Sequence, residues 1–260
     1  MKKNIFRAYD VFGNMAVVKF PEKIKLKDKK NHAKKILKNN GSVKTVLEKT
    51  GKFKGRLRLM QTKYILGEKT KEVLYKENGC VFRFNIDETY FSSRLSNERK
   101  EIAEKIKKKD NVLVMFAGVS PFSIVIAKKS KAIILSNEIN RKANKYAKIN
   151  IDLNNLKENV ELAQGDIKKV ALKLKQKFDV IVMPRPQLKD SFLKQAFKLS
   201  KKGTRIFYYD FCKQDEIGTI VEKVKSEAKK SKKKIKILKK KVAGDVGPYR
   251  IRCRIDFKII

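Results

Sequence analysis

The stretch of residues 112–127 constrains the fold more than any other part of the chain. Residues 112–116 are apolar without alternation, which is typical of a strand buried on both faces of a sheet. Gly118 then predicts a tight turn, and apolar residues recur at helical spacing over 122–127. A second apolar run follows at 132–136. Strand, short turn, helix and strand in this order predict the first unit of a parallel sheet with right-handed crossovers.

The same alternation continues toward the C-terminus. Further strands are predicted over 159–162, 178–183 and 205–209, and helices over 97–107, 141–150, 191–200 and 215–230. The runs 234–241 and 249–259 predict an antiparallel pair at the edge of the sheet. We therefore expect an α/β fold, with a Rossmann-like domain over residues 89–260 whose sheet is mostly parallel.

Residues 1–88 predict a separate, small α+β domain. Two hairpins are expected, turning at Gly13-Asn14 and at Asn78-Gly79, and an Asn-Gly pair favours a tight turn. A helix is predicted over 29–40 and strands over 42–48 and 56–65.

The charge of the chain indicates a polyanionic partner. Its 260 residues include 66 Lys and Arg against 27 Asp and Glu, a formal net charge of +39. An excess of this size favours binding to nucleic acid. The alternative is a lysine-rich surface that is only solvated.

No segment indicates export, a membrane span or a metal site. The first ten residues lack the apolar core of a signal peptide, and no run approaches the roughly 20 apolar residues that span a bilayer. Three widely spaced cysteines and one histidine lack the paired spacing of zinc ligands. We expect a cytoplasmic protein without a metal or a membrane contact.

Polar residues follow three successive predicted strands. Gly118 permits close approach of a ligand to the backbone, Glu138 can accept hydrogen bonds from both hydroxyls of a ribose, and Asp166 can accept one from the adenine amine. The alternative is that Glu138 and Asp166 only cap the helices that follow. A dinucleotide fingerprint and a Walker loop are both absent from the sequence, so the single glycine favours S-adenosylmethionine as the cofactor.

Two motifs carry a family resemblance. The segments YFSSRLSNER at 90–99 and MFAGVSPFS at 115–123 resemble tRNA (guanine-N1)-methyltransferases of the Trm5 type, the Met-10+ like family of archaea and eukaryotes. Further similarity lies at 10–17, 55–68, 137–140, 150–154, 165–166 and 247–257. The resemblance covers nearly the whole chain, and the family's extra N-terminal domain is expected to be missing.

The resemblance implies an activity, a cofactor and a partner. The expected fold is that of a class I methyltransferase, which transfers a methyl group from S-adenosylmethionine to N1 of the guanosine 3′ of the anticodon. The partner would be the anticodon stem-loop of tRNA, and we expect a monomer. The cofactor-binding residues implied are Phe116, Ala117, Gly118, Val119, Pro121, Glu138, Ile139 and Asp166.

Methylation at guanine N1 requires the removal of a ring proton while negative charge develops on O6. A base and a nearby cation are therefore both useful. The resemblance assigns the base to Glu98 and the cation to Arg58, with Arg56 as a neighbouring candidate. The base pocket implied is formed by Tyr90, Arg94, Arg99, Pro184, Arg185 and Pro186, with Arg185 as an RNA contact. Without the resemblance, Glu98 and Arg99 could simply begin a helix and form a surface ion pair.

The chain departs from the family pattern at three positions. Val114 replaces a usual Asp, Ser120 replaces a common second Gly, and Pro184 stands where the family often has Asn. Two alternatives stay open: the related aminocarboxypropyltransferase of the wybutosine pathway, and a non-catalytic RNA-binding relative. Ser93-Arg94 favours the methyltransferase over the first, and retention of Glu98 and Glu138 favours an active enzyme over the second.

Overall fold

The chain consists of two compact units. The computed structural model describes residues 9–51 and 55–260, and its units are Met1–Ser93 and Arg94–Ile260. The division falls after Ser93 rather than after the expected residue 88.

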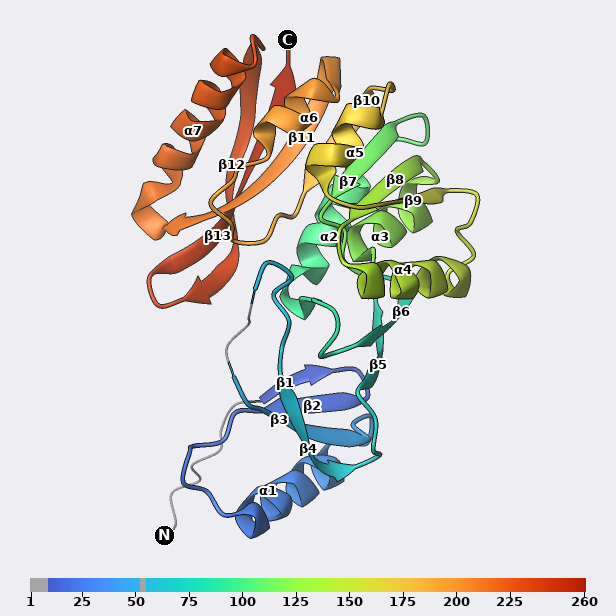
Figure 1. The fold of residues 1–260 in the computed structure, drawn as a ribbon, viewed down its shortest axis with the longest axis vertical. Helices are drawn as coiled ribbons and strands as arrows, with labels where there is room; N and C mark the ends of the chain where they lie inside the picture. Colours follow the sequence, from blue (N-terminus) through green and yellow to red (C-terminus); the bar gives the residue numbers. More distant parts are fainter. Residues whose placement is uncertain (1–8, 52–54) are drawn as a thin grey trace. The chain divides into compact units, whose positions relative to one another are not determined.

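The first unit holds a four-stranded sheet with one helix against it. The strands follow the order β1-β2-β3-β4: β1 (Tyr9–Phe12), β2 (Met15–Val18), β3 (Thr45–Lys49) and β4 (Thr62–Gly67). Helix α1 (Leu26–Asn39) packs against β3 and β4 (Figure 1). Apolar side chains from both layers, among them Val18, Ile36 and Val46, form the core. A separate hairpin, β5 (Glu72–Glu77) and β6 (Cys80–Asn85), turns at Asn78-Gly79 as predicted.

The predicted strand over 56–65 is wrong in its first half. Residues 55–58 form turns, and regular strand begins only at Thr62. Gly55 and Arg58 have positive φ angles of 65° and 52°, a left-handed conformation that is incompatible with a regular strand.

The second unit holds the predicted α/β sheet, which is confirmed together with its antiparallel C-terminal edge. Its seven strands follow the order β12-β13-β11-β10-β7-β8-β9: β7 (Asn111–Met115), β8 (Ile133–Glu138), β9 (Val160–Gln164), β10 (Phe178–Met183), β11 (Ser200–Lys213), β12 (Ile235–Gly247) and β13 (Arg250–Ile259). The strands from β11 to β9 in this order are parallel, whereas β13 runs antiparallel to both β11 and β12.

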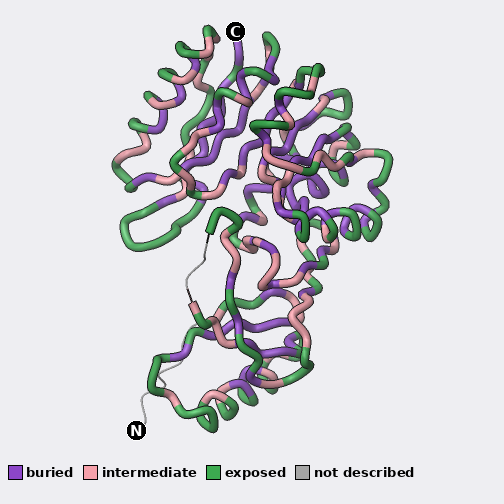
Figure 2. Tube along the Cα trace, in the orientation of Figure 1, coloured by how far each residue is buried: buried purple, intermediate pink, exposed green. Residues whose placement is uncertain are grey.

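Helices cover both faces of this sheet. They are α2 (Ser96–Glu104), α3 (Pro121–Ser130), α4 (Arg141–Leu153), α5 (Ile167–Lys173), α6 (Leu193–Lys198) and α7 (Ile217–Lys230), with short 3₁₀ turns η1 (Ser93–Leu95) and η2 (Gln214–Glu216). Leu113 and Met115 of β7 pack in one core with side chains of α5, α6 and α7. Ser136 of β8 pairs with Val114 and bonds to α3, so α3 lies on the opposite face. Burial is highest in the central strands, as Figure 2 shows.

Glycine is required where the β1–β2 turn meets β5. Gly13 has a φ of +54°, and a Cβ placed there would lie 1.9 Å from the carbonyl oxygen of Leu74. Asn14 holds the contact in place because its Oδ1 accepts a hydrogen bond of 2.8 Å from the backbone N–H of Leu74. Gly79 also has a positive φ, +70°, but a Cβ placed there would have nothing within 4 Å of it.

These two glycines give a matched test of the packing in the first unit. Gly79→Ala should lower the free energy of unfolding by about 1 kcal/mol, the usual cost of a left-handed alanine. Gly13→Ala adds a backbone overlap and should cost about 3 kcal/mol. Urea unfolding followed by circular dichroism measures both values, and equal losses would contradict the close approach of Gly13 to β5.

Candidate active site

The loop after β7 lies where the direction of winding of the sheet reverses. The chain runs from β7 to β8 and β9 on one side, and then returns to β10 on the other side of β7 (Figure 1). Ligands of open α/β sheets bind in the crevice that such a reversal leaves at the carboxyl ends of the strands. Residues 116–120, which connect β7 to α3, therefore occupy the position of a cofactor loop.

The loop is folded tightly by three residues with left-handed backbone. Phe116, Gly118 and Ser120 have φ angles of 60°, 59° and 65°. The N–H of Ala117 donates to the carbonyl of Asn137 on β8 at 2.9 Å, which fixes the start of the loop. Such a conformation is costly for a residue other than glycine.

Ser120 gains hydrogen bonds that a glycine would not make. Its Oγ lies 2.9 Å from Oγ of Ser136 on β8, and Ser123 of α3 donates to the same Ser136 Oγ at 2.8 Å. All three serines are buried. The departure from the family pattern at position 120 is therefore accommodated by a buried hydroxyl cluster that ties the loop to β8.

Glu138 at the end of β8 is held against the loop. Its Oε2 accepts a hydrogen bond from the N–H of Gly118 and its Oε1 accepts one from the N–H of Asn140, both at 2.7 Å. The cap of α4 is the Asn140 side chain, which accepts from the N–H of Lys142 at 2.9 Å. The helix-capping alternative for Glu138 is therefore wrong. Each carboxylate oxygen can accept more than one hydrogen bond, so this half-buried group fits the hydroxyls of a ribose.

Asp166 follows β9 and does cap a helix. Its Oδ1 accepts a hydrogen bond of 2.9 Å from the N–H of Lys168, which makes Asp166 the N-cap of α5. The capping alternative thus holds for Asp166, and this role fixes the carboxylate beside Gly165, whose N–H donates to the carbonyl of Glu138 at 2.8 Å. The predicted residues of strands β7, β8 and β9 meet at one edge of the sheet.

Asparagine side chains hold the remaining backbone of this edge. The family resemblance at 137–140 and 150–154 was the only sequence signal for them. Asn150 of α4 is fully buried and donates to the carbonyl of Val119 at 3.1 Å. Asn137 donates to the carbonyls of Ala163 and Gly165 at 2.7 and 3.0 Å. Carbonyl groups at the ends of strands and in loops need hydrogen-bond donors, and these amides supply them.

Glu98, the predicted base, is buried on α2 with only 4% of its surface exposed. Its Oε2 accepts hydrogen bonds from the Tyr209 hydroxyl at 2.9 Å and from Arg254 at 2.5 Å. Its Oε1 lies 2.6 Å from Nζ of Lys241. Burial raises the pKa of Tyr209 well above its usual value, so this hydroxyl remains a donor at neutral pH. Two cations and a phenol therefore fix the position of the Glu98 side chain.

Arg254 of β13 is the centre of this cluster and was not predicted from the sequence. Its guanidinium is fully buried and bonds to three carboxylates: Glu98, Glu101 at 2.7 Å and Asp256 at 2.6 Å. Lys105 lies 3.1 Å from Glu101 and 3.3 Å from Asp256. Burial alone would raise the pKa of Glu101, but hydrogen bonds from Arg254, Lys241 and Lys105 hold it well below its ordinary value.

Three carboxylates and three cations form the centre of this group, and a fourth cation, Lys239, lies 3.6 Å from Glu101. Glu98, Glu101 and Asp256 face Arg254, Lys105 and Lys241, and each carboxylate has at least one of these cations within 3.3 Å. We call these six residues the Arg254 cluster. It joins α2 to the antiparallel edge of the sheet, and it sets the orientation of Glu98.

Other predicted pocket residues lie in both units. In the first unit the guanidinium of Arg58 lies 5.5 Å from the ring centre of Tyr90. In the second unit Arg94 is exposed on η1, whereas Arg99 is only 1% exposed and its guanidinium lies over the Phe122 ring at 5.7 Å. The Arg99 side chain is thus packed between α2 and α3 instead of being open to a substrate.

Arg185 does not reach the surface, contrary to the expected RNA contact. Its guanidinium is buried, pairs with Asp210 at 2.6 Å and donates to the carbonyl of Asp190 at 2.9 Å. The buried carboxylate of Asp210 requires a counter-charge, and Arg185 supplies it together with Lys223 at 2.9 Å. Pro184 and Pro186, on either side of Arg185, are half-buried.

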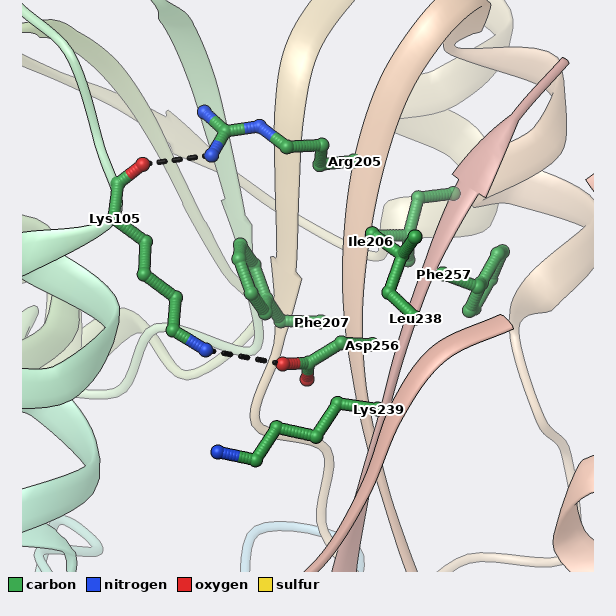
Figure 3. A pocket seen from close by; sticks show the side chains of 8 residues that line it. All are labelled: Lys105, Arg205, Ile206, Phe207, Leu238, Lys239, Asp256 and Phe257. Carbon is green, nitrogen blue, oxygen red and sulfur yellow. Dashed lines mark hydrogen bonds and ion pairs between the residues drawn. The ribbon is translucent and has the colours of Figure 1, made fainter. Parts of the chain in front are cut away.

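A cavity of about 260 Å³ lies beside the Arg254 cluster, away from the cofactor loop. Figure 3 shows Phe207 on the same side of the strands as Lys105, Arg205 and Asp256, whereas the ring of Phe257, which also lines the cavity, lies on the opposite side in the core. Arg205 donates to the carbonyl of Lys105 at 2.7 Å. Because Arg205 pairs with Val180 near the start of β10, the cavity lies toward the amino ends of the parallel strands, where sheets of this kind do not bind ligands.

Residues 9–51 and 55–260 contain neither a membrane-spanning helix nor a cluster of metal ligands. Within these ranges no helix is long and apolar enough to cross a membrane. The same residues contain no group of three or more His, Cys, Asp or Glu side chains that could hold a metal ion.

Comparison with known proteins decides the family. The profile described as the TRM5/TYW2 methyltransferase domain matches residues 73–238. The chain belongs to this family. A second profile, the TYW2 N-terminal domain, matches residues 1–70. The resemblance inferred from the two sequence motifs is thereby confirmed.

Three relatives illustrate the similarity. The tRNA (guanine(37)-N(1))/4-demethylwyosine(37)-methyltransferase Taw22 of Nanoarchaeum equitans is 33% identical over 97% of this chain and 100% of its own length. The crystal structure of Trm5b from Pyrococcus abyssi is 32% identical, with a TM-score of 0.85 over 97% of this chain and 74% of that one. The complex structure of aTrm5 and tRNALeu is 28% identical, with a TM-score of 0.83 over 97% of this chain and 72% of that one.

The Arg254 cluster makes a testable contribution to stability. Arg254→Leu would leave three carboxylates with one buried cation fewer, and it should lower the free energy of unfolding by about 3–5 kcal/mol. Arg252→Leu is the matched control, since Arg252 lies two residues away on the same strand, is half-buried and has its guanidinium over the Phe211 ring at 5.2 Å. Urea unfolding compares the two. Similar, small losses would show that the cluster does not hold α2 to the sheet.

Proposed function

We propose that this protein transfers a methyl group from S-adenosylmethionine to N1 of guanosine 37 in tRNA. The observation that carries the proposal is Glu98, a buried side chain that pairs with Arg254 and Lys241 and lies on the helix that precedes the cofactor strand β7. A general base must hold an acceptor oxygen in a fixed position, and these two ion pairs orient both oxygens of Glu98. Membership of the TRM5/TYW2 methyltransferase family supports the same activity.

S-adenosylmethionine is the cofactor, and it supplies an electrophilic methyl group bound to a positively charged sulfur. Glu138 would accept hydrogen bonds from the ribose hydroxyls, while its own bond to Gly118 keeps the loop in position. Asp166 would accept a hydrogen bond from the adenine amine. The backbone of Phe116, Ala117, Gly118, Val119 and Pro121, together with Ile139, would line the site.

The target guanine requires both a base and a cation. Glu98 would take the N1 proton, and Arg58 is the candidate cation for O6 that the family resemblance supplies. The contact of Arg58 with Tyr90 supports this role because stacking restricts the long side chain of the arginine. Arg94, exposed on η1, would contribute to the base pocket.

The macromolecular substrate would be tRNA. A net charge of +39 favours binding to the phosphate backbone. The similarity to the structure of aTrm5 with tRNALeu supports the same class of partner.

One specific observation favours a second candidate. Residues 1–70 match the TYW2 N-terminal domain, and the related aminocarboxypropyltransferase of the wybutosine pathway uses the same cofactor. That enzyme would transfer the aminocarboxypropyl group instead of the methyl group. A position-37 base that is already modified is a further possible acceptor, as the name of the Nanoarchaeum relative indicates.

A labelling assay separates these activities. The protein is incubated with tRNA carrying G37 or A37 and with S-adenosylmethionine labelled either in the methyl group or in the aminocarboxypropyl carbons. We expect methyl label only, on N1 of G37, with no reaction at A37. Transfer of the aminocarboxypropyl label to a wyosine-precursor tRNA, without methyl transfer to G37, would establish the second candidate instead.

The role of Glu98 is tested by Glu98→Gln, which keeps the shape of the side chain and an oxygen for Tyr209 and Arg254. Loss of a general base should lower single-turnover methyl transfer by about 10²–10⁴-fold. The dissociation constant for tRNA should stay within about threefold, since Glu98 is buried in the free protein. Equal effects on rate and affinity would exclude Glu98 as the base.

The role of Glu138 is tested by calorimetric titration with S-adenosylmethionine. Glu138→Gln replaces one acceptor oxygen with an amide, so affinity should fall about tenfold or more, as expected for lost hydrogen bonds to a charged group. Glu161→Gln, at an exposed position of β9, is the matched control and should leave affinity unchanged. Unchanged binding by the Glu138 variant would place the ribose elsewhere.

A further inference from the structure

One face of strands β11 and β13 leads away from Glu98 and opens to solvent. Three successive cross-strand pairs lie on this face: Tyr209–Arg254, Phe211–Arg252 and Lys213–Arg250. The first pair bonds to Glu98 and is buried, the second is half-buried and the third is exposed. The face is therefore open on the side of Glu98 that points toward the carboxyl end of β11.

The half-buried pair supplies apolar surface and a fixed cation. The guanidinium of Arg252 lies 5.2 Å from the ring centre of Phe211. A guanidinium over an aromatic ring is restricted in its motion, and its N–H groups can still bond to phosphate oxygens. Proteins that bind a single RNA strand combine aromatic and cationic side chains in this way.

A cavity of about 490 Å³ lies where the face ends. Its lining comes from the end of β11, the start of η2 and the turn between β12 and β13, and consists of Lys213, Gln214, Asp215 and Tyr249. Because β11 is parallel to β10, and β10 to β7, this end of β11 lies at the sheet edge that carries the cofactor loop. Its volume is within the range of small-molecule sites, about 300–1,000 Å³.

Tyr249 is held open at this cavity. Its side chain is 88% exposed, at the hairpin tip that Figure 2 shows as exposed. With Pro248 it forms a two-residue turn, and its φ of 56° is a conformation that favours glycine or asparagine. Burial of the ring does not offset the strain of this backbone. A strained residue whose ring is left in solvent points to a role in binding.

The polar groups around the cavity suit a nucleobase better than a phosphate. Nζ of Lys213 lies 3.5 Å from Glu216, and Asp215 adds a second negative charge. A carboxylate repels phosphate but accepts hydrogen bonds from the N–H groups of a base, and the Gln214 amide can both donate and accept. Unpaired bases are recognised by stacking on an aromatic ring together with such contacts to the base edge.

We propose that this cavity binds the unpaired base of a nucleotide next to the target guanosine, with the base stacked on Tyr249 and bonded to Gln214 and Asp215. The inference rests on the proposed function, which places the target base at Glu98. The first and last of the three cross-strand pairs are about 14 Å apart along the strands, so splayed-out bases of neighbouring nucleotides can occupy both sites. The neighbour is therefore nucleotide 36 or 38, and Arg252 lies beside the path between the two bases.

The experiment measures coupling between Tyr249 and a single base of the RNA. Dissociation constants are determined for tRNA with its normal anticodon loop and for tRNA with an abasic nucleotide at position 36 or at position 38. The proteins are the wild type, Tyr249→Leu and the matched control Tyr249→Phe, which keeps the ring. Binding is measured without S-adenosylmethionine, so no turnover is needed.

Tyr249→Leu should raise the dissociation constant for normal tRNA about tenfold or more, as expected for the loss of one base–aromatic stack. With an abasic nucleotide at one of the two positions, the wild type should bind equally weakly and Tyr249→Leu should add no further loss, because the stacking partner is already missing. Tyr249→Phe should bind every tRNA within about twofold of the wild type, since stacking needs only the ring. Thermal unfolding should be the same for all three proteins because the side chain is exposed.

The inference would be overturned by unchanged affinity of Tyr249→Leu for normal tRNA. Losses that add fully at both abasic positions would overturn it as well, since Tyr249 would then contact neither neighbouring base. Equal losses in Tyr249→Leu and Tyr249→Phe would assign the effect to the hydroxyl group and exclude stacking. Absence of methyl transfer to G37 by the wild type would refute the proposed function, whereas the binding measurements test the base site separately.

Discussion

The buried guanidinium of Arg254 is the constraint on which the second unit depends. A charge removed from water must be matched where it lies, and Arg254 is matched by carboxylates from α2 and from its own strand. Because Glu98 and Glu101 both come from α2, the helix is fixed in height and rotation against β13. β7 begins only a few residues after that helix, so the same ion pairs align the proposed base with the cofactor edge of the sheet.

The parts of the fold that follow from periodicity were predictable from sequence. An apolar run without alternation can only be buried on both faces, which identified the central strand, and a glycine between strand and helix identified the loop. Glu138 could be assigned because the carboxyl ends of the first two strands of such a unit lie side by side, whichever side chains the strands carry. Its bond to Gly118 is the contact that this adjacency produces.

The Arg254 cluster could not be predicted, since the pattern of β13 indicates something else. Ile251, Cys253, Ile255 and Phe257 alternate with charged residues, which is typical of a strand with one face in water. The middle of that polar face, at Arg254 and Asp256, is nevertheless buried, and Arg254 pairs with carboxylates of α2. A single sequence does not reveal which charges lie opposite one another when they are 153 or 156 residues apart. Arg185 was misassigned for the same reason: it follows β10, and its partner, Asp210, lies on β11, 25 residues away in the sequence. At Arg58, a left-handed backbone delays the beginning of a strand that the side-chain pattern alone predicts from residue 56.

The edge position of β12 has a consequence for the protein's behaviour in concentrated solution. An unpaired strand edge offers free backbone groups to any other extended chain, and long edges are common starting points for aggregation. Lys236, Lys239 and Lys240 are exposed along this strand, so two copies approaching edge to edge bring like charges together. The same lysines that suit a polyanion thus keep one molecule from extending the sheet of the next, and this protection weakens as salt screens their charge.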